Sequence, residues 1–466
     1  MEDAMDATYQ FAENFRSIAY EDLPKEVVDI TKKEILDTLG VALAGFSQRG
    51  PKELLEMVLA WGGKEESSII GCPQKVPAPH AAQVNATMVH ARDYDDVHET
   101  AVMHPGVVTI PSALAIGELK GGLSGKEFIT AVALGVDMIC RLGLATRPGV
   151  SPIKTGWHFT TLYGYPTAAM TAGKILGLDE EKLVNAFGIA YHQCSGNGQC
   201  VRDGALTKRM GPGFSVRGGL TAALMAEKGL TGARNCLEGE AGLFNVYHYG
   251  GYDRRTLVHD LGKHFEGINV SIKPYPCCRG VHPSIDAALA VVNGHNIKPE
   301  DVKQIAIVTG EANHFLLCMP FEQKVTPRNP VDAQFSIPWG VAAAIARRRV
   351  TTNDYTEAAI KDKDLLGLTA MMKAEVDPDF NNFEDGMEPA RVTITTKDGR
   401  TFSAQVGNPL GSPQRPMSFE DCVRKFEDCV SLSGNRLSVE KVKRVIDLIA
   451  GLEAVKDARK IIGLLM

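Results

Sequence analysis

Apolar residues recur at the period of an α-helix over most of the first 265 positions. From Asp22 this spacing continues to glycines at positions 40 and 45, through Val27, Val28, Ile30, Ile35, Leu36 and Leu39. Comparable spacing predicts helices at about residues 52–61, 80–91, 110–118, 125–146, 165–176, 180–195 and 214–229. Many of these helices carry Ala and Gly on their apolar faces, and small residues let helix backbones approach closely. We therefore predict a compact helical bundle for this region.

After about residue 268 the apolar pattern changes to that of β-strands. Strands are predicted at residues 268–273, 302–308, 391–396 and 401–406. The last two flank Asp398-Gly399, a dipeptide that favours the positive φ angles of a tight hairpin turn. Helices are predicted between the strands at about 282–293 and 332–348. Residues 418–466 return to amphipathic helices, which we expect to pack back on the first region.

These changes of pattern predict a mainly α fold with an α+β insertion. A chain of 466 residues is too long for one ordinary hydrophobic core, so more than one structural unit is expected. We assign residues 1–267 together with 410–466 to a large all-helical domain. Residues 268–409 form a smaller α+β domain in this prediction.

Composition and charge exclude several classes of protein. An apolar fraction of 44% with 23% charged residues is typical of a globular protein. A net charge of −6, with no run of basic residues longer than the three arginines at 347–349, disfavours nucleic-acid binding. The most apolar segment, residues 128–145, is interrupted by Asp137 and Arg141, which indicates a buried helix and not a membrane span. The N-terminal residues lack the layout of a signal peptide, and the ten cysteines lack CxxC spacing. We expect a cytoplasmic protein without a structural metal.

Residues 91–106, with the sequence ARDYDDVHETAVMHPG, concentrate ionisable side chains. Pro105 disfavours helix at the residue before it, so His104 should project from a loop. Asp93 and Asp96 are three residues apart and could share one face of a helix end. Carboxylates and imidazoles together suit acid/base catalysis or a divalent metal, and aspartates that cap helices in solvent would give the same pattern. From the residues alone, all three interpretations stay open.

Basic residues lie at three other apparent breaks in the helical pattern. His158 precedes a Gly/Pro break at residues 164–166, and Lys208 and Arg209 precede Met-Gly-Pro-Gly. Lys273 begins an extended stretch, because each following proline restricts the residue before it. Taken one at a time, such residues are more often a satisfied core histidine or a solvated helix end.

The order of these motifs resembles that of the MmgE/PrpD family. Its motifs appear here as Asp93-Tyr-Asp-Asp, His104-Pro, Trp157-His158, Thr207-Lys208 and Lys273-Pro-Tyr-Pro-Cys-Cys. The resemblance covers nearly the whole chain. It implies a large all-helical domain made of the N-terminal region and the C-terminal helices, a smaller lid-like α+β domain between them, and a homodimer without an obligatory metal or cofactor. It therefore disfavours the metal interpretation of the aspartate cluster.

The family includes 2-methylcitrate dehydratase, cis-aconitate decarboxylase and iminodisuccinate epimerase, which move a proton at a carbon next to a carboxylate of a small anion. Such chemistry needs cations near the developing negative charge and a base within hydrogen-bond reach. The resemblance implies that five residues are catalytic: Asp93, His104, His158, Lys208 and Lys273. The lysines would bind substrate carboxylates, with Lys273 also a candidate for proton transfer. The two histidines would form an acid/base pair, and Asp93 would orient and polarise His104 or a lysine.

Six further residues are predicted to bind substrate or to lie behind the site: Arg209, Tyr275, Cys278, Arg279, His98 and His282. The chain departs from the family pattern at two positions. The decarboxylases that it resembles carry threonine where Val97 stands and histidine where Cys278 stands. The loss of one hydroxyl and one imidazole should alter which polycarboxylate fits.

The leading hypothesis is a cofactor-independent lyase that eliminates water or carbon dioxide from a small di- or tricarboxylate. The first alternative is an epimerase of an amino- or imino-dicarboxylate, which abstracts the same proton and returns it to the opposite face. The second is a non-catalytic family member that binds a polycarboxylate. The reaction product distinguishes the three.

Overall fold

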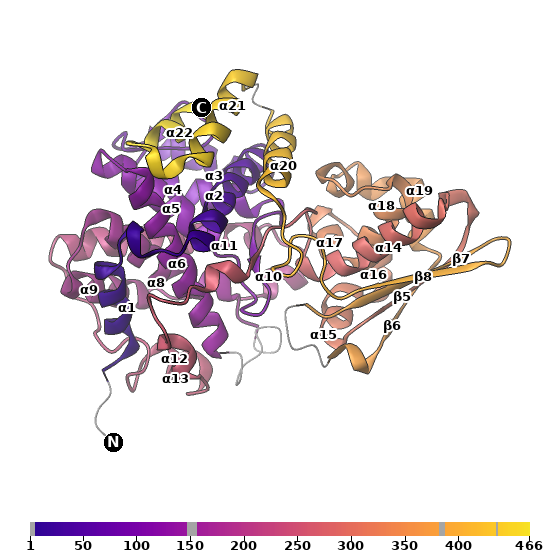
Figure 1. Ribbon diagram of the computed structural model, residues 1–466, viewed down its shortest axis with the longest axis horizontal. Helices are drawn as coiled ribbons and strands as arrows, with labels where there is room; N and C mark the ends of the chain where they lie inside the picture. The colour runs from indigo at the N-terminus through magenta and orange to yellow at the C-terminus, as the bar shows by residue number, and fades with distance from the viewer. Residues whose placement is uncertain (1–4, 147–155, 382–386, 435–436) are drawn as a thin grey trace.

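The computed structural model describes residues 5–146, 156–381, 387–434 and 437–466 (Figure 1). Its described residues form two large hydrophobic cores and one small cluster around Tyr94. The larger core joins residues from both ends of the chain, from Ala7 to Ile272 and from Met417 to Leu465. The smaller core runs from Tyr275 to Ile394. The fold is mainly helical with an α+β part, as the sequence predicts. Ile272 belongs to the larger core and Tyr275 to the smaller one, so the chain passes from one core to the other between these residues.

Helices build the larger part. From the N-terminal region they are α1 (Ala7–Ser17), α2 (Lys25–Gly45), α3 (Pro51–Trp61), α4 (Ala78–His90), α5 (Gly106–Lys120), α6 (Gly125–Thr146), α8 (Phe159–Leu176), α9 (Glu180–Tyr191), α10 (Gln199–Arg202), α11 (Thr207–Glu227), α12 (Leu243–His248) and α13 (Arg254–Val258). A small ribbon pairs β1 (Ser67–Ser68) with β2 (Lys75–Val76). Helix α1 is not among the predicted helices; Asp6 caps it, accepting a hydrogen bond from the backbone N–H of Thr8.

Three helices begin earlier than their sequences predict, and this changes where the candidate residues lie. Helices α5, α8 and α11 continue through Pro111, Pro166 and Pro212, which we took as helix starts or breaks. A proline removes one N–H donor and its ring crowds the carbonyl four residues earlier, and tertiary packing outweighs this cost here. The apparent breaks after His158 and Lys208 are therefore wrong: both residues lie at the N-terminal ends of continuous helices.

The C-terminal helices pack back on the first region, as predicted. They are α20 (Phe419–Leu432), α21 (Val439–Ala450) and α22 (Arg459–Leu464), coloured yellow in Figure 1. Helix α20 lies on α2, where a Cβ atom at Gly40 would come within 2.9 Å of Phe426, so the glycine permits this close approach. Lys425 of α20 forms a buried ion pair with Asp37 of α2, with 2.6 Å between Nζ and Oδ1.

The smaller part contains a four-stranded sheet in the order β6-β5-β7-β8. Its strands are β5 (Val302–Thr309), β6 (Met372–Val376), β7 (Ala390–Thr396) and β8 (Thr401–Val406). The predicted hairpin is present between β7 and β8, with Gly399 at a φ of 88°. Strand β6, parallel to β5, was not predicted, because its sequence Met-Lys-Ala-Glu-Val buries a single residue.

Helices of the smaller part lie beside this sheet in Figure 1. They are α14 (His282–His295), α15 (Glu311–Asn313), α16 (Phe321–Val325), α17 (Pro330–Gln334), α18 (Ile337–Arg347) and α19 (Lys363–Thr369). The single helix predicted at 332–348 is two helices. Ser336 divides them: its side chain accepts a hydrogen bond from the N–H of Trp339 and caps α18.

The strand predicted at 268–273 is shorter and lies elsewhere than expected. Strand β4 (Val270–Ser271) pairs antiparallel with β3 (Val97–His98) of the helical part and not with the sheet of the smaller part. This ribbon carries the chain from the larger core towards Lys273. It thereby brings the segment after Asp93 next to the segment that contains Lys273.

Within the described ranges, α6 is the one helix long and apolar enough to span a membrane by length and composition. Its most apolar window is 94% buried inside the structure. Arg141 and Asp137 within it form an ion pair of 2.9 Å. These features are those of a core helix, as its two charges predicted.

Candidate active site

The centre of the candidate site is an aspartate held between two lysines. Asp93 follows α4 in a turn with a left-handed φ of 51°, which aspartate tolerates better than most residues. Its Oδ1 lies 2.9 Å from Lys273 Nζ and 3.2 Å from Lys208 Nζ, and all three side chains are buried. Burial opposes ionisation, but the two lysine charges outweigh it and hold the pKa of Asp93 well below its usual range. Because α4 ends at His90 and residues 91–96 are not helical, Asp93 and Asp96 do not share a helix face.

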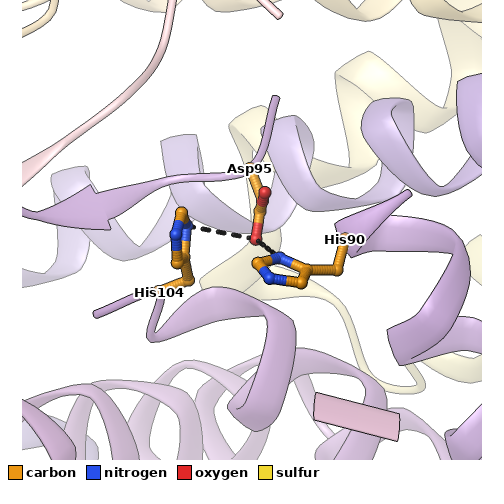
Figure 2. Close-up of side chains that lie close together, drawn as sticks. All are labelled: His90, Asp95 and His104. Carbon is orange, nitrogen blue, oxygen red and sulfur yellow. Dashed lines mark hydrogen bonds and ion pairs between the residues drawn. The ribbon is translucent and has the colours of Figure 1, made fainter. Parts of the chain in front are cut away.

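Beside this triad, one carboxylate lies between two imidazoles (Figure 2). Asp95 Oδ2 is 2.7 Å from His90 Nδ1 and 3.3 Å from His104 Nδ1. His104 Nδ1 is also 2.8 Å from the backbone carbonyl of Asp96, which can only accept a hydrogen bond. The proton of neutral His104 therefore sits on Nδ1, and Nε2 carries the lone pair.

These imidazoles are neutral at neutral pH. Burial lowers the pKa of His104 to about 3. The negative charge of Asp95 raises this pKa, whereas the positive charges of Lys273 and Lys208 lower it further. Burial likewise places the pKa of His158 well below its usual range. A neutral imidazole with a free lone pair can accept a proton, which suits a general base.

Segments that are distant along the chain converge on this cluster. His90 ends α4, His104 precedes α5, His158 is the N-cap residue of α8, Lys208 lies in the first turn of α11, and Lys273 follows β4. The rings of His90 and His158 are 5.8 Å apart, and His158 Nδ1 is 2.7 Å from the Thr161 hydroxyl. The structure thus brings the five predicted catalytic residues into one cluster, and their catalytic roles stay a prediction.

The site lies where the smaller part meets the helical part. Lys208 Nζ is 5.3 Å from the centre of the Phe335 ring, so the smaller part covers this lysine. The side-chain amide of Gln334 donates to the backbone carbonyl of Arg92 at 2.6 Å. The Tyr94 hydroxyl donates to the carbonyl of Pro274 at 3.1 Å. Substrate bound at Asp93 would therefore contact both parts of the chain.

Several polar atoms of the cluster have unmet hydrogen bonds. Within the described ranges, Asp93 Oδ2, Asp95 Oδ1, His90 Nε2 and Lys208 Nζ are buried without a hydrogen-bond partner, although Lys208 is ion-paired. Buried polar groups in folded proteins are nearly always satisfied. These atoms are the ones available to a polar ligand.

The residues predicted to bind substrate are for the most part engaged elsewhere. The Tyr275 hydroxyl donates to Asp286 at 2.7 Å, and Arg279 Nε donates to Glu99 at 2.7 Å. His282 Nδ1 is 3.0 Å from Arg279 Nη1. These three contacts use the polar groups that a substrate would need, and the contact between Arg279 and Glu99 joins the smaller part to the helical part.

The other three predicted binding residues differ in their surroundings. His98 lies on β3, 3.5 Å from Glu266, and lines a separate cavity of about 170 Å³. Arg209 forms no ion pair with Asp93 and donates to the backbone carbonyl of Arg49 at 2.9 Å. Cys278 is half-buried, and burial raises the pKa of its thiol. Their binding role stays a prediction.

Sequence reasoning gave no role to His90 or Asp95. We expected Asp93 to orient His104 or a lysine. Asp93 pairs with the two lysines, and the carboxylate beside His104 is that of Asp95. His90 is near the end of the helix predicted at 80–91, three residues before Asp93. The signal that could have found it is the density of ionisable residues, which begins at His90.

The side chains of His90, Asp95 and His104 form a group that could hold a metal ion. Within the described ranges, His90, Asp95 and His104 are the residues whose ligand atoms lie within 4.8 Å of one another, and imidazole with carboxylate suits zinc. The positive charge of Lys208 acts on both imidazoles and that of Lys273 acts on His104, and both charges oppose the binding of a cation. The arrangement fits proton transfer better than metal binding.

Comparison with protein families agrees with this geometry. The chain matches the MmgE/PrpD N-terminal domain over residues 9–254 and the MmgE/PrpD C-terminal domain over residues 275–453. The chain belongs to the MmgE/PrpD family. Cis-aconitate decarboxylase of Aspergillus terreus is 25% identical over 470 residues, covering 96% of this chain and 94% of that protein.

Two further relatives in the family have similar coverage. Cis-aconitate decarboxylase of Homo sapiens is 26% identical over 467 residues, which is 98% of this chain and 94% of that protein. 2-Methylcitrate dehydratase of Escherichia coli (strain K12) is 24% identical over 426 residues, which is 85% of this chain and 84% of that protein. The two family models establish the MmgE/PrpD family, and relatives at this level of identity leave the substrate of this chain to be argued from the site.

Proposed function

We propose that this protein is a lyase that eliminates water or carbon dioxide from a small tricarboxylate. The observation that carries the proposal is the buried cluster in which Asp93 lies between two lysines and beside three neutral imidazoles. The family relatives support it, because their names specify cis-aconitate decarboxylation and 2-methylcitrate dehydration.

In a dehydration, His104 Nε2 takes the proton from a carbon next to a carboxylate. The electron pair of the broken C–H bond forms the carbon–carbon double bond. Hydroxide leaves as water with a proton from His158, which must enter the step as an imidazolium and becomes neutral on giving up this proton. Lys208 and Lys273 stabilise the negative charge that develops on the carboxylate. Asp95 then stabilises the imidazolium formed on His104, since its carboxylate is 3.3 Å from Nδ1.

A decarboxylation uses the same groups in a different order. The C–C bond to the departing carboxylate breaks, carbon dioxide leaves, and the remaining electron pair takes a proton from a histidine. That histidine must first be protonated. The negative charge of a bound polycarboxylate favours its protonation, since it counteracts the lysine charges that keep the free site neutral.

Turnover assays distinguish these reactions. Purified protein is incubated with cis-aconitate, 2-methylcitrate, citrate and iminodisuccinate, and release of carbon dioxide and formation or loss of the alkene are followed by NMR. We expect turnover of at least one tricarboxylate, a loss of at least about 10²-fold in His104→Gln, and full activity in the control His192→Gln, which changes an exposed imidazole.

Two other results would replace the lyase proposal. Solvent deuterium that enters unreacted substrate, without alkene or carbon dioxide, would indicate an epimerase. Binding of all four compounds without any turnover would indicate a non-catalytic family member.

The proposal extends to the domain division, the assembly and the compartment of the protein. We propose the large domain 1–267 with 410–466, the smaller domain 268–409, and a homodimer, the last by family resemblance. Light scattering on the purified protein tests the dimer. A cytoplasmic location agrees with all ten cysteines being free thiols, as expected in a reducing compartment.

A further inference from the structure

Four arginine side chains are more than nine-tenths buried in the described part of the chain, and they fall into two classes. Arg141 and Arg279 each pair with a carboxylate, Asp137 at 2.9 Å and Glu99 at 2.7 Å. Arg92 is 8% exposed and Arg209 is 5% exposed, yet neither has a carboxylate oxygen within 4.0 Å among the described residues. A buried cation without a counter-charge is unfavourable, so these two arginines need an explanation.

The protein contacts of this arginine pair, Arg92 and Arg209, leave most of their donors unused. Arg92 Nε donates to the carbonyl of Ala44 at 3.0 Å, and Arg209 Nη1 donates to the carbonyl of Arg49 at 2.9 Å. Arg209 Nε is buried and has no hydrogen-bond partner. Each guanidinium has five N–H donors, so one carbonyl contact leaves it able to bind an oxyanion in a bidentate manner.

The arginine pair adjoins the candidate active site. Arg92 precedes Asp93 in the sequence, and Arg209 follows Lys208. Asp93 and Lys208 are themselves joined by an ion pair of 3.2 Å. Burial, together with the neighbouring charge of Arg92, lowers the pKa of Arg209 to about 10, with Asp93 acting in the opposite direction. The carboxyl group of Glu357, which is exposed, also acts on Arg209 but forms no ion pair with it.

The charges of the site explain why a second cationic group is needed. Lys208 and Lys273 contribute two positive charges, and Asp93 and Asp95 contribute two negative charges, because the pKa values of both aspartates are lowered. The imidazoles are neutral. The cluster is therefore close to neutral overall, whereas a tricarboxylate carries up to three negative charges.

We propose that Arg92 and Arg209 form an anion subsite that binds a carboxylate through charge-assisted hydrogen bonds, beside the Asp93 cluster. The carboxylate belongs either to the substrate molecule held at Asp93 or to a separate anion that binds as an effector. The first case rests on the proposed function, and the second does not. Both use the same chemistry, and binding measurements separate them.

Calorimetry on the full chain tests the subsite with two probes, tricarballylate and inorganic phosphate. Tricarballylate has three carboxylates but neither the hydroxyl nor the double bond of the proposed substrates. We expect Arg209→Gln and Arg92→Gln each to weaken tricarballylate binding by roughly 10- to 100-fold, the range for a lost hydrogen bond to a charged group. Arg209→Lys should restore part of the affinity, because it keeps the charge and loses the bidentate geometry.

The pattern across the probes identifies the source of the carboxylate. A weaker tricarballylate affinity together with a KM increase larger than the kcat decrease supports a substrate subsite. Loss of phosphate binding with tricarballylate binding unchanged supports a separate effector anion. Unchanged affinity for both probes in both glutamine variants overturns the proposal.

Thermal unfolding separates the subsite from a purely structural role. If the arginine pair only holds the turn after α2, Arg209→Gln should lower the unfolding temperature and leave both affinities unchanged, which would overturn the proposal. If the pair is an anion subsite, Arg209→Gln in anion-free buffer should not be destabilised, since it removes an unpaired charge. Arg279→Gln is the matched control and should be destabilised, because it leaves Glu99 buried without its partner.

Failure of the subsite and failure of the lyase proposal give different results. A chain without turnover on any tricarboxylate whose tricarballylate binding still depends on Arg209 retains the subsite and loses the enzymatic function. Normal turnover together with tricarballylate binding that does not depend on Arg92 or Arg209 would reject the subsite and leave the lyase proposal intact.

Discussion

Two buried ion pairs of this protein differ in how completely their atoms are satisfied. In α6, Arg141 Nε contacts both oxygens of Asp137 at 3.0 and 2.9 Å, and its terminal nitrogens donate to four backbone carbonyls. Asp137 accepts a further hydrogen bond from the N–H of Glu266 at 2.9 Å. A buried pair with this many partners holds structure together and leaves nothing for a ligand to bind.

The pair of Lys208 and Asp93 is equally buried but incompletely satisfied. Asp93 Oδ2 and Lys208 Nζ have no hydrogen-bond partner among the described residues, and neither has His90 Nε2 nearby. A fold that leaves buried polar atoms unmet loses stability at that place, and such losses are expected at functional sites. On this comparison alone, without reference to any relative, we call Arg141 and Asp137 the structural pair and propose Lys208 and Asp93 as the functional pair.

The largest expected effect is on the structural pair. Arg141→Met should lower the free energy of unfolding by about 3–5 kcal/mol, because it leaves Asp137 and four carbonyls without their partner. Turnover per folded molecule should stay the same, since α6 contributes no group to the cluster. Denaturant titration measures the first quantity and an active-site-normalised assay the second. An Arg141→Met variant of normal stability would break the comparison.

The next effect is on the functional pair and has the opposite signature. Lys208→Met should reduce kcat by roughly 10²- to 10³-fold, as expected when a group that stabilises developing negative charge is lost. The free energy of unfolding should change little, because Asp93 keeps Lys273 at 2.9 Å. Lys126→Met, which changes an exposed lysine of α6, is the control. Strong destabilisation without loss of kcat would place Lys208 among the structural residues.

A smaller effect is expected at Asp95, which touches two imidazoles and not the proposed substrate. Asp95→Asn keeps the shape but removes the charge that stabilises an imidazolium on His104, and kcat should fall on the order of 10- to 100-fold. KM should change by less than kcat, since no substrate contact is lost. Steady-state kinetics checks this division. A change confined to KM would mean that Asp95 binds substrate directly.

Much of the fold could be predicted from local patterns, and the exceptions have physical reasons. The hairpin at Asp398-Gly399 and the return of α20 onto α2 follow from turn chemistry and amphipathic spacing. Helices α5, α8 and α11 were predicted to begin too late, because the cost of a proline within a helix is decided by tertiary packing that a local pattern does not contain. Strand β6 was missed because most of its side chains are not buried.

The candidate site could be predicted only in part. The order of the motifs predicts Asp93, His104, His158, Lys208 and Lys273 as site residues, and the structure brings these residues together. Which buried polar atoms lack a hydrogen-bond partner depends on all of their neighbours in space, and these neighbours cannot be read from a sequence motif. That information distinguishes the unpaired Arg209 from the paired Arg279, although both are arginines next to a family motif.

A third class of buried charge lies behind the site, where carboxyl groups have few partners. Asp96 is fully buried, and its Oδ2 accepts a hydrogen bond from the N–H of Gly106 at 2.9 Å. Burial raises the pKa of Asp96, and the negative charge of Asp95 raises it further. Burial also raises the pKa of Glu34 on α2, and Asp96 adds to that effect. These carboxyl groups therefore retain protons at a pH at which exposed carboxylates are ionised.

The smallest effect follows from that retained proton. A carboxyl group whose pKa is raised by folding stabilises the fold fully below its unfolded value, near 4, and this stability is lost as the pH rises towards the folded pKa. Asp96→Asn has nearly the shape of the protonated acid and cannot ionise. Its stability relative to the natural protein should therefore grow with pH above about 4, by at most about 1.4 kcal/mol per pH unit. Urea titrations between pH 4 and 8 measure this, with the exposed Asp428→Asn as control. A stability difference that does not change with pH would show that Asp96 is ionised in the folded protein, and the proton would then have to lie on Glu34.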